Sequence, residues 1–172
     1  HGFRSLSPAR FLNFHTPDGR FADALRERDR GGPGPSDSID AEPGSGLPAP
    51  EAILLDTGEG ETLHGQHRVA TIKAASDELS LIEFEIEPRF GGPDPHTHDD
   101  HTDAFYVLDG SAEFLADGRR VVAVPGMFVA ATPGVRHTFR SGPIGARLLN
   151  IHAPGAGFAE RLREMSFATA AR

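Results

Sequence analysis

The sequence of 172 residues has no cysteine and a single lysine. Without cysteine the chain can form neither a disulfide framework nor a thiolate site, and the setting that this composition predicts is cytoplasmic. No apolar run approaches the roughly 20 residues of a membrane-spanning helix. The net charge of -8 disfavours a phosphate backbone as partner, because binding one needs clustered lysine and arginine. We therefore expect the partner to be a small molecule, with no nucleic acid and no membrane.

One stretch, residues 96–110, is crowded with histidine and aspartate and reads HTHDDHTDAFYVLDG. His96 and His98 are two residues apart, so on an extended strand both imidazoles project from one face and can reach one point. The apolar run after Asp103 has the composition of a strand. Far downstream, His137 follows a Thr-Pro-Gly turn. Three imidazoles and one carboxylate suit a divalent transition metal.

These residues resemble the two motifs of the cupin family. The first motif is His-x-His, three or four residues, Glu, six residues and Gly; its counterparts here are His96, His98, Asp103 and Gly110, with Asp in place of Glu. In the second motif, the residues in register are Gly126, Gly134 and His137, whereas Thr132 and Ser141 depart from the family's Pro and Asn. The resemblance covers about residues 51–172.

The resemblance implies an all-β fold, a cupin barrel (a double-stranded β-helix or jelly roll) with a short C-terminal helix. It also implies one divalent transition metal ion, which would be iron, manganese, nickel, copper or zinc, inside the barrel. The implied ligands are His96, His98, Asp103 and His137. Because aspartate is one methylene shorter than glutamate, His101 is the alternative fourth ligand; otherwise we expect it to be an outer-sphere or surface group. Asp99 and Asp100 are expected to be solvated turn residues.

The beginning of the chain repeats its end. ARFLNFHTPDGRFADALRE, from residue 9, matches ARLLNIHAPGAGFAERLRE, from residue 146, and HGFRS at residue 1 matches HTFRS at residue 137. The repeat has the length of a strand plus an amphipathic helix. It predicts that residues 1–28 are the remnant of an upstream cupin, and hence a fragment of a two-cupin (bicupin) parent. Residues 29–50 are rich in Gly and Pro and are expected to be a flexible linker to the barrel at 51–172.

The barrel segment has short β patterns separated by turns. The expected strands are residues 52–55, 69–73, 79–87, 104–108, 112–115, 119–124, 127–131 and 147–151, and a helix is expected over 158–165. Strict alternation places Ile82, Phe84 and Ile86 on a buried face. Asp117 and Gly118 predict a hairpin turn. His64 and His67 fall in a turn-rich stretch and are expected at the surface.

Strand parity also predicts an apolar substrate pocket beside the metal. Phe105 and Val107 share the face of Asp103, and Phe139 shares the face of His137. Ordinary barrel core is the alternative for all three residues.

A metal with at most four protein ligands keeps positions open for chemistry. The cupin resemblance implies dioxygenases, decarboxylases, isomerases and cyclases, besides binding domains. We expect a metal-dependent oxygenase acting on a small aromatic or enolisable substrate. A non-redox isomerase, cyclase or decarboxylase and a non-enzymatic binding cupin are the alternatives.

Because a lone strand and helix cannot bury their apolar faces, residues 1–28 are expected to dock on a barrel, and a homodimer is favoured.

Overall fold

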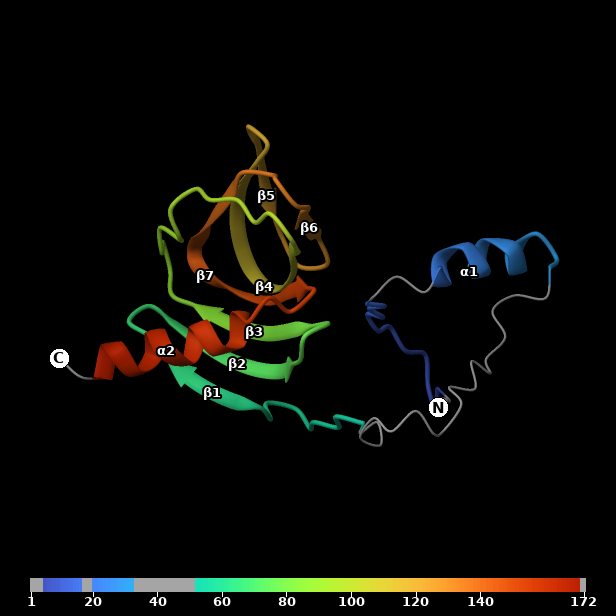
Figure 1. Ribbon diagram of the computed structural model, residues 1–172, viewed down its shortest axis with the longest axis horizontal. Coiled ribbons are helices and arrows are strands. Elements are labelled where there is room, and N and C mark those ends of the chain that lie inside the picture. Colours follow the sequence, from blue (N-terminus) through green and yellow to red (C-terminus); the bar gives the residue numbers. More distant parts are fainter. Residues whose placement is uncertain (1–4, 17–19, 33–51, 171–172) are drawn as a thin grey trace. The chain divides into compact units, whose positions relative to one another are not determined.

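The computed structural model describes residues 5–16, 20–32 and 52–170 and divides into two units, residues 1–47 and 48–172 (Figure 1). Most of the expected linker, residues 33–50, lies outside the described residues. No described helix combines the length and apolar character needed to cross a membrane.

The second unit is a β-barrel in which two long strands form the central pair. β4 (Thr102–Ala116) and β7 (His137–Ala153) are antiparallel along almost their whole lengths. Two register shifts near Asp109 and Gly110 mark bulges, which bend β4. Gly110 has φ 68°, and a Cβ there would collide with the carbonyl oxygen of Gly145 on β7. The glycine that ends the first cupin-like motif is therefore required by this close approach.

The other strands extend the central pair on both sides. β1 (Glu61–His64), β2 (Arg68–Ala75) and β3 (Ser80–Ile86) continue from the carboxyl half of β7. On the other side, β6 (Phe128–Ala131) pairs with the amino half of β4 and β5 (Arg119–Ala123) with its carboxyl half. The strand order is β1-β2-β3-β7-β4-β5, with β6 also on β4. This curved, antiparallel arrangement is the all-β barrel expected from the sequence (Figure 1).

The core follows the predicted alternation. Ile82, Phe84 and Ile86 of β3 are buried, whereas Glu85 between them is exposed. Helix α2 (Phe158–Ala170) packs on β1, β2 and β3 and buries Leu162 against them. The helix is longer than the predicted 158–165.

The predicted hairpin turn is also confirmed, since Asp117 and Gly118, between β4 and β5, have φ 49° and 72°, as a tight two-residue turn requires.

The entry to the barrel differs from the prediction. Residues 52–55 form no strand, and Ile53 and Leu54 are exposed. Instead β1 forms in the stretch predicted to be turns, because Glu61–His64 can pair with β2. His64 and His67 are exposed, as predicted. Hydrophobicity favoured residues 52–55, but a strand forms where a neighbouring strand completes its hydrogen bonds.

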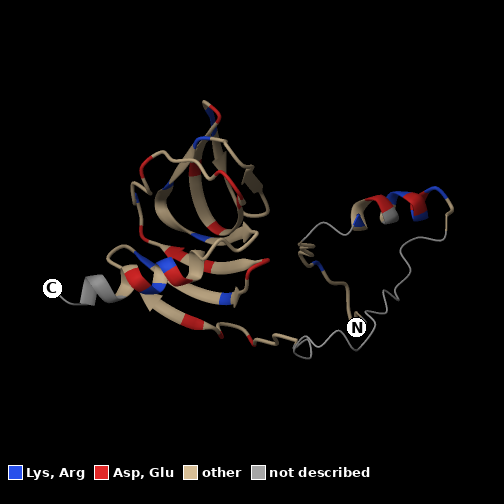
Figure 2. Cartoon of the chain, in the orientation of Figure 1, with Lys and Arg blue, Asp and Glu red and all other residues tan. Residues whose placement is uncertain are grey.

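The first unit contains helix α1 (Phe21–Asp29), as the repeat predicts, but no strand over residues 9–14. Figure 2 shows charges of both signs along α1. Within this helix Asp23 and Arg26 form an ion pair of 2.8 Å. Phe11 and Leu12 are 59% and 42% exposed. In the described residues the expected strand finds no neighbouring strand with which to pair. The origin of residues 1–28 in an upstream cupin stays a prediction.

Candidate metal centre

The four candidate ligands come from three segments that β7 holds together. His96 and His98 lie between β3 and β4, Asp103 is the second residue of β4, and His137 is the first residue of β7. An isolated antiparallel bridge joins His96 to His137, with N···O distances of 3.0 and 2.9 Å. The amide of Gly134 donates to the carbonyl of His98 at 2.7 Å. The two halves of the sequence motif are thus tied together by backbone hydrogen bonds.

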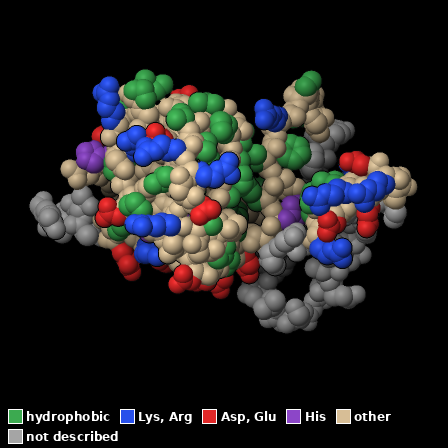
Figure 3. All heavy atoms as spheres, turned by 90° about the horizontal axis from the view of Figure 1, so that it is seen from above, with side chains coloured by type: hydrophobic (Ala, Val, Ile, Leu, Met, Phe, Trp, Pro, Cys, Tyr) green, Lys and Arg blue, Asp and Glu red, His purple; other side chains and the backbone are tan. Residues whose placement is uncertain are grey.

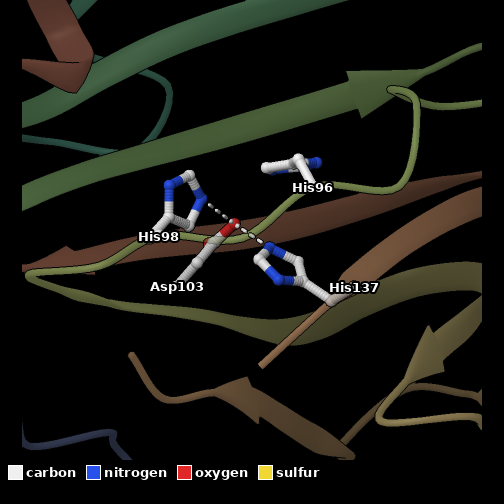
Figure 4. Close-up of side chains that lie close together, drawn as sticks. All are labelled: His96, His98, Asp103 and His137. Atoms are coloured by element: carbon white, nitrogen blue, oxygen red, sulfur yellow. Dashed lines mark hydrogen bonds and ion pairs between the residues drawn. The ribbon is translucent and has the colours of Figure 1, made fainter. Parts of the chain in front are cut away.

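The side chains of these four residues converge, and their ligand atoms all lie within 4.8 Å of one another (Figure 4). Asp103 Oδ2 is 3.2 Å from His137 Nε2 and 3.7 Å from His98 Nε2. Two donors bound to one ion at about 2.1 Å lie roughly 3.0 to 3.4 Å apart at octahedral or tetrahedral angles. The shorter aspartate therefore reaches the cluster, and the donor atoms fit a single transition metal ion.

Backbone carbonyls orient two of the imidazoles. His96 Nδ1 lies 2.8 Å from the carbonyl oxygen of Asp94, and His137 Nδ1 lies 2.9 Å from that of Val135. Because a carbonyl only accepts, each Nδ1 carries the proton and each Nε2 offers a lone pair to the cluster. His98 Nε2 is buried and has no hydrogen-bond partner. An ion bound here would satisfy that atom, which is otherwise costly to bury.

The carboxylate of Asp103 is held in its charged form. Burial alone would raise its pKa, but the close imidazoles of His137 and His98 and the more distant His152 outweigh burial and lower the pKa below its usual value. Burial lowers the pKa of His137, but the hydrogen bonds with Asp103 and the Val135 carbonyl outweigh burial. The pKa of His137 is therefore raised above its usual value. A carboxylate that stays ionised against burial is a suitable ligand for a cation.

Two residues that the sequence analysis did not select complete the site from β7. Asn150 Nδ2 donates to Asp103 Oδ1 at 2.5 Å, and His152 Nε2 lies 3.1 Å from Asn150 Oδ1. Both residues are 1% exposed, and His152 pairs with Asp103 in register across the sheet. Strand parity could have identified them from the sequence, since Asn150 and His152 lie on the same face of the strand as the buried Leu148. Polar residues on such a face require partners.

His101 lies in the interior, which corrects the expectation that it could be a surface group. It is 3% exposed, and its ring centroid is 4.1 Å from that of His98 and 4.9 Å from that of His152. Its Nδ1 lies 2.7 Å from a carboxylate oxygen of Asp100. Asp99 and Asp100 are exposed, as predicted. His101 belongs to a second group of histidines, His98, His101 and His152.

The three predicted pocket residues are part of the apolar interior. Phe105, Val107 and Phe139 belong to one buried cluster, in which Phe114 also packs, with ring centroids 5.0 to 5.6 Å apart. Grooves of about 460 Å³ beside α2 and about 490 Å³ beside residues 53–58 are lined by other residues. Contact of these three side chains with a substrate stays a prediction.

Comparison with known proteins agrees with this fold. The model of the cupin domain matches residues 82–152. The quercetin 2,3-dioxygenase of Bacillus subtilis (strain 168) is 25% identical over 105 residues, which cover 59% of this chain and 31% of that enzyme. The chain thus spans about a third of the length of this curated relative.

Two solved structures share the fold. KdgF from Halomonas sp. superposes with a TM-score of 0.54 at 17% identity, covering 61% of this chain and 94% of the other. An RmlC-like cupin from Shewanella frigidimarina gives 0.54 at 22% identity, covering 61% and 92%. The barrel, its histidine and aspartate cluster and these matches define a cupin with the donor set of a metal site. Residues 82–152 match the cupin domain, and the barrel that contains them has the cupin fold.

Proposed function

We propose that this chain is a metal-dependent cupin that acts as an oxygenase on a small aromatic or enolisable compound. The observation that supports the proposal most is the convergence of three imidazoles and one carboxylate within 4.8 Å. The four residues His96, His98, Asp103 and His137 would hold one ion of iron, manganese, nickel, copper or zinc. Similarity to a protein named as a quercetin dioxygenase favours oxygen chemistry over the alternatives.

An ion held in this way supplies a Lewis acid and, if it is redox-active, a place for reaction with oxygen. The chain's own residues prepare that position. Asn150 fixes Asp103 through its 2.5 Å hydrogen bond, and the carbonyls of Asp94 and Val135 fix His96 and His137. Such outer partners maintain ligand geometry and metal affinity.

The surroundings suit an apolar substrate. Phe105, Val107 and Phe139 are buried on the same faces of β4 and β7 as Asp103 and His137. They exclude water from that side, which strengthens electrostatic interactions at the cluster. His96 and His98 are only half-buried, so a small molecule would approach from the segment before β4.

Metal loading followed by an oxygen assay tests this proposal. The full chain is freed of metal, reconstituted with each of the five ions, and supplied with phenols and diketones in an oxygen electrode. We expect one tightly bound ion per chain and oxygen uptake with a redox-active ion. Replacing His96, His98 or His137 by Ala should remove most of the tightly bound metal, whereas the exposed His64→Ala is the matched control.

The outcomes separate the candidate functions. Turnover without oxygen uptake would replace the oxygenase by a non-redox isomerase, cyclase or decarboxylase. Substrate binding without turnover would favour a binding cupin. Full retention of tightly bound metal in all three histidine variants would contradict the metal centre itself.

We also propose that two copies associate. Figure 3 shows apolar side chains among basic ones on the face of the barrel seen from above. The exposed apolar residues of β5, β6 and the segment between them are Val121, Val122, Val124, Met127 and Phe128. Light scattering of the full chain and of a chain beginning at Glu51 tests this. A dimer in both cases places the interface on the barrel, a dimer of the full chain alone places it on the N-terminal unit, and two monomers contradict the proposal.

A further inference from the structure

A second group of histidines lies beside the first cluster and shares one member with it. His98, His101 and His152 offer ligand atoms within 4.8 Å of one another. His101 and His152 are 3% and 1% exposed. Three buried imidazole nitrogens in this group have no hydrogen-bond partner, namely His98 Nε2, His101 Nε2 and His152 Nδ1. Unpaired buried polar atoms are rare, and three in one place require a physical explanation.

The proton on His152 follows from its neighbours. Asn150 donates through Nδ2 to Asp103 Oδ1 at 2.5 Å and to the carbonyl of Ala104 at 3.3 Å. This fixes the amide so that its Oδ1 can only accept. His152 Nε2, 3.1 Å from that oxygen, must therefore carry the proton. The lone pair of neutral His152 is then on Nδ1, the atom that has no partner.

The same reasoning applies to His101. Its Nδ1 lies 2.7 Å from a carboxylate oxygen of Asp100, which accepts, so Nδ1 carries the proton. The lone pair is then on Nε2, again the atom without a partner. Two lone pairs, one from His101 and one from His152, thus lie close to His98 Nε2, and none of the three atoms has a hydrogen-bond partner among the described residues.

We propose that His98, His101 and His152 form a second position for a divalent cation, distinct from the cluster with His96, Asp103 and His137. Three neutral imidazoles suit nitrogen-preferring ions such as zinc, cobalt, nickel or copper, with a fourth position left open. A single water molecule could donate to His101 Nε2 and His152 Nδ1 but would need His98 Nε2 to carry a proton, whereas one cation is bound by the lone pairs of all three nitrogens. The inference concerns metal binding alone and does not depend on the reaction proposed above.

Because the two positions share His98, only one of them can use this residue at a time. One lone pair on His98 Nε2 bonds one ion at a time, so His98 serves either position. The first position has four donors and the second three, so the first is expected to bind more tightly. His98 is therefore required at both positions, whereas His137 is required only at the first.

Equilibrium zinc titration of the full chain against a competing chelator tests the second position. The double variant His96→Ala/His137→Ala removes two ligands of the first position and none of the second. We expect it to bind one zinc ion, more weakly than the unmodified chain. Adding His101→Gln or His152→Gln should weaken that binding at least about 10-fold, the smaller loss seen even for outer-sphere partners. His64→Ala/His67→Ala in the same background is the control, because both residues are exposed.

The inference is overturned if the folded double variant takes up no zinc, or if its zinc affinity is unaffected by both glutamine substitutions. Circular dichroism establishes folding of each variant. If the double variant does not fold, the single variants His137→Ala and His98→Ala replace it: the first should retain zinc that depends on His101, and the second should not. An absence of oxygen uptake by the metal-loaded chain would contradict the proposed function but leave this titration unchanged.

Discussion

Residues 9–27 and 146–164 are identical at 11 of 19 positions but differ in structure. In the second copy the chain forms the end of β7 and then α2, within the barrel. In the first copy the corresponding helix α1 is present, but residues 9–14 form no strand. The helix depends on hydrogen bonds within its own segment, whereas a strand depends on neighbours from elsewhere in the chain.

A local side-chain contact is also retained in both copies. His15 stacks on Phe21 with ring centroids 4.1 Å apart, and the matching His152 stacks on Phe158 at 3.8 Å. The rings are inclined by 12° and 18°. Residues six positions apart thus meet in the same way with or without a barrel, which supports the prediction that the two segments are related.

What differs is the environment of the matched residues. Asn150 and His152 lie between β3 and β4 and contact Asp103, whereas their counterparts Asn13 and His15 are exposed. The same side chains thus support a candidate metal centre in one copy and face solvent in the other. Four pairs of substitutions test this difference.

The largest difference is expected in the core. Leu148 is fully buried, so Leu148→Ala should lower the free energy of unfolding by about 3 kcal/mol, because it removes apolar contacts and leaves a cavity. In the first copy the counterpart of Leu148 is Phe11, and Leu12 beside it is the comparison. Leu12 is 42% exposed, so Leu12→Ala should change the free energy of unfolding by less than about 0.5 kcal/mol. Urea denaturation measures both. Equal losses would show that residues 9–14 are packed as tightly as β7.

The next difference is expected at the matched asparagines. Asn150→Ala leaves the buried carboxylate of Asp103 without its amide donor, which should cost about 1 to 3 kcal/mol of stability. The same change should weaken metal binding about 10- to 100-fold. Asn13→Ala is the control and should alter neither quantity. Unchanged metal affinity in Asn150→Ala, measured by chelator competition, would mean that Asn150 does not support metal binding through Asp103.

A smaller difference is expected for the stacked rings. Phe158→Leu keeps an apolar side chain but removes the stack on His152, and the barrel should lose about 1 kcal/mol. Phe21→Leu removes the matching stack on His15 and should leave the thermal transition of the barrel in place. Calorimetry compares the two variants. A shift of the barrel transition by Phe21→Leu would show that α1 is coupled to the barrel.

The smallest difference is expected for the matched arginines. Arg163 of α2 pairs with Glu61 of β1 at 2.6 Å, and Arg26 pairs with Asp23 within α1. Because Glu61 is 46% exposed, a double-mutant cycle with Arg163→Gln and Glu61→Gln should give a coupling of only about 0.2 to 1 kcal/mol. The coupling should decline in 1 M salt, where charges are screened. Arg26→Gln should not change the stability of the barrel, and a salt-independent coupling would contradict the exposed ion pair.

Features encoded in neighbouring or regularly spaced residues were predicted from the sequence. The alternation at Ile82, Phe84 and Ile86 identified β3, and the two-residue turn at Asp117 identified the β4–β5 hairpin. The motifs with His96 and His137 selected residues that the structure brings together. The first two inferences need only strand parity and turn conformation, which are properties of the chain itself, whereas the choice of His137 rests on the resemblance to the cupin motifs.

Features that depend on contacts between distant residues were decided by the tertiary structure. β1 formed at Glu61–His64 rather than at residues 52–55 because β2 was there to pair with it. The pairing of β4 with β7 set Asn150 and His152 against Asp103 and enclosed His101. A single sequence determines which face a strand residue occupies, but not which strand that face meets, because the choice is made by the packing of the whole barrel.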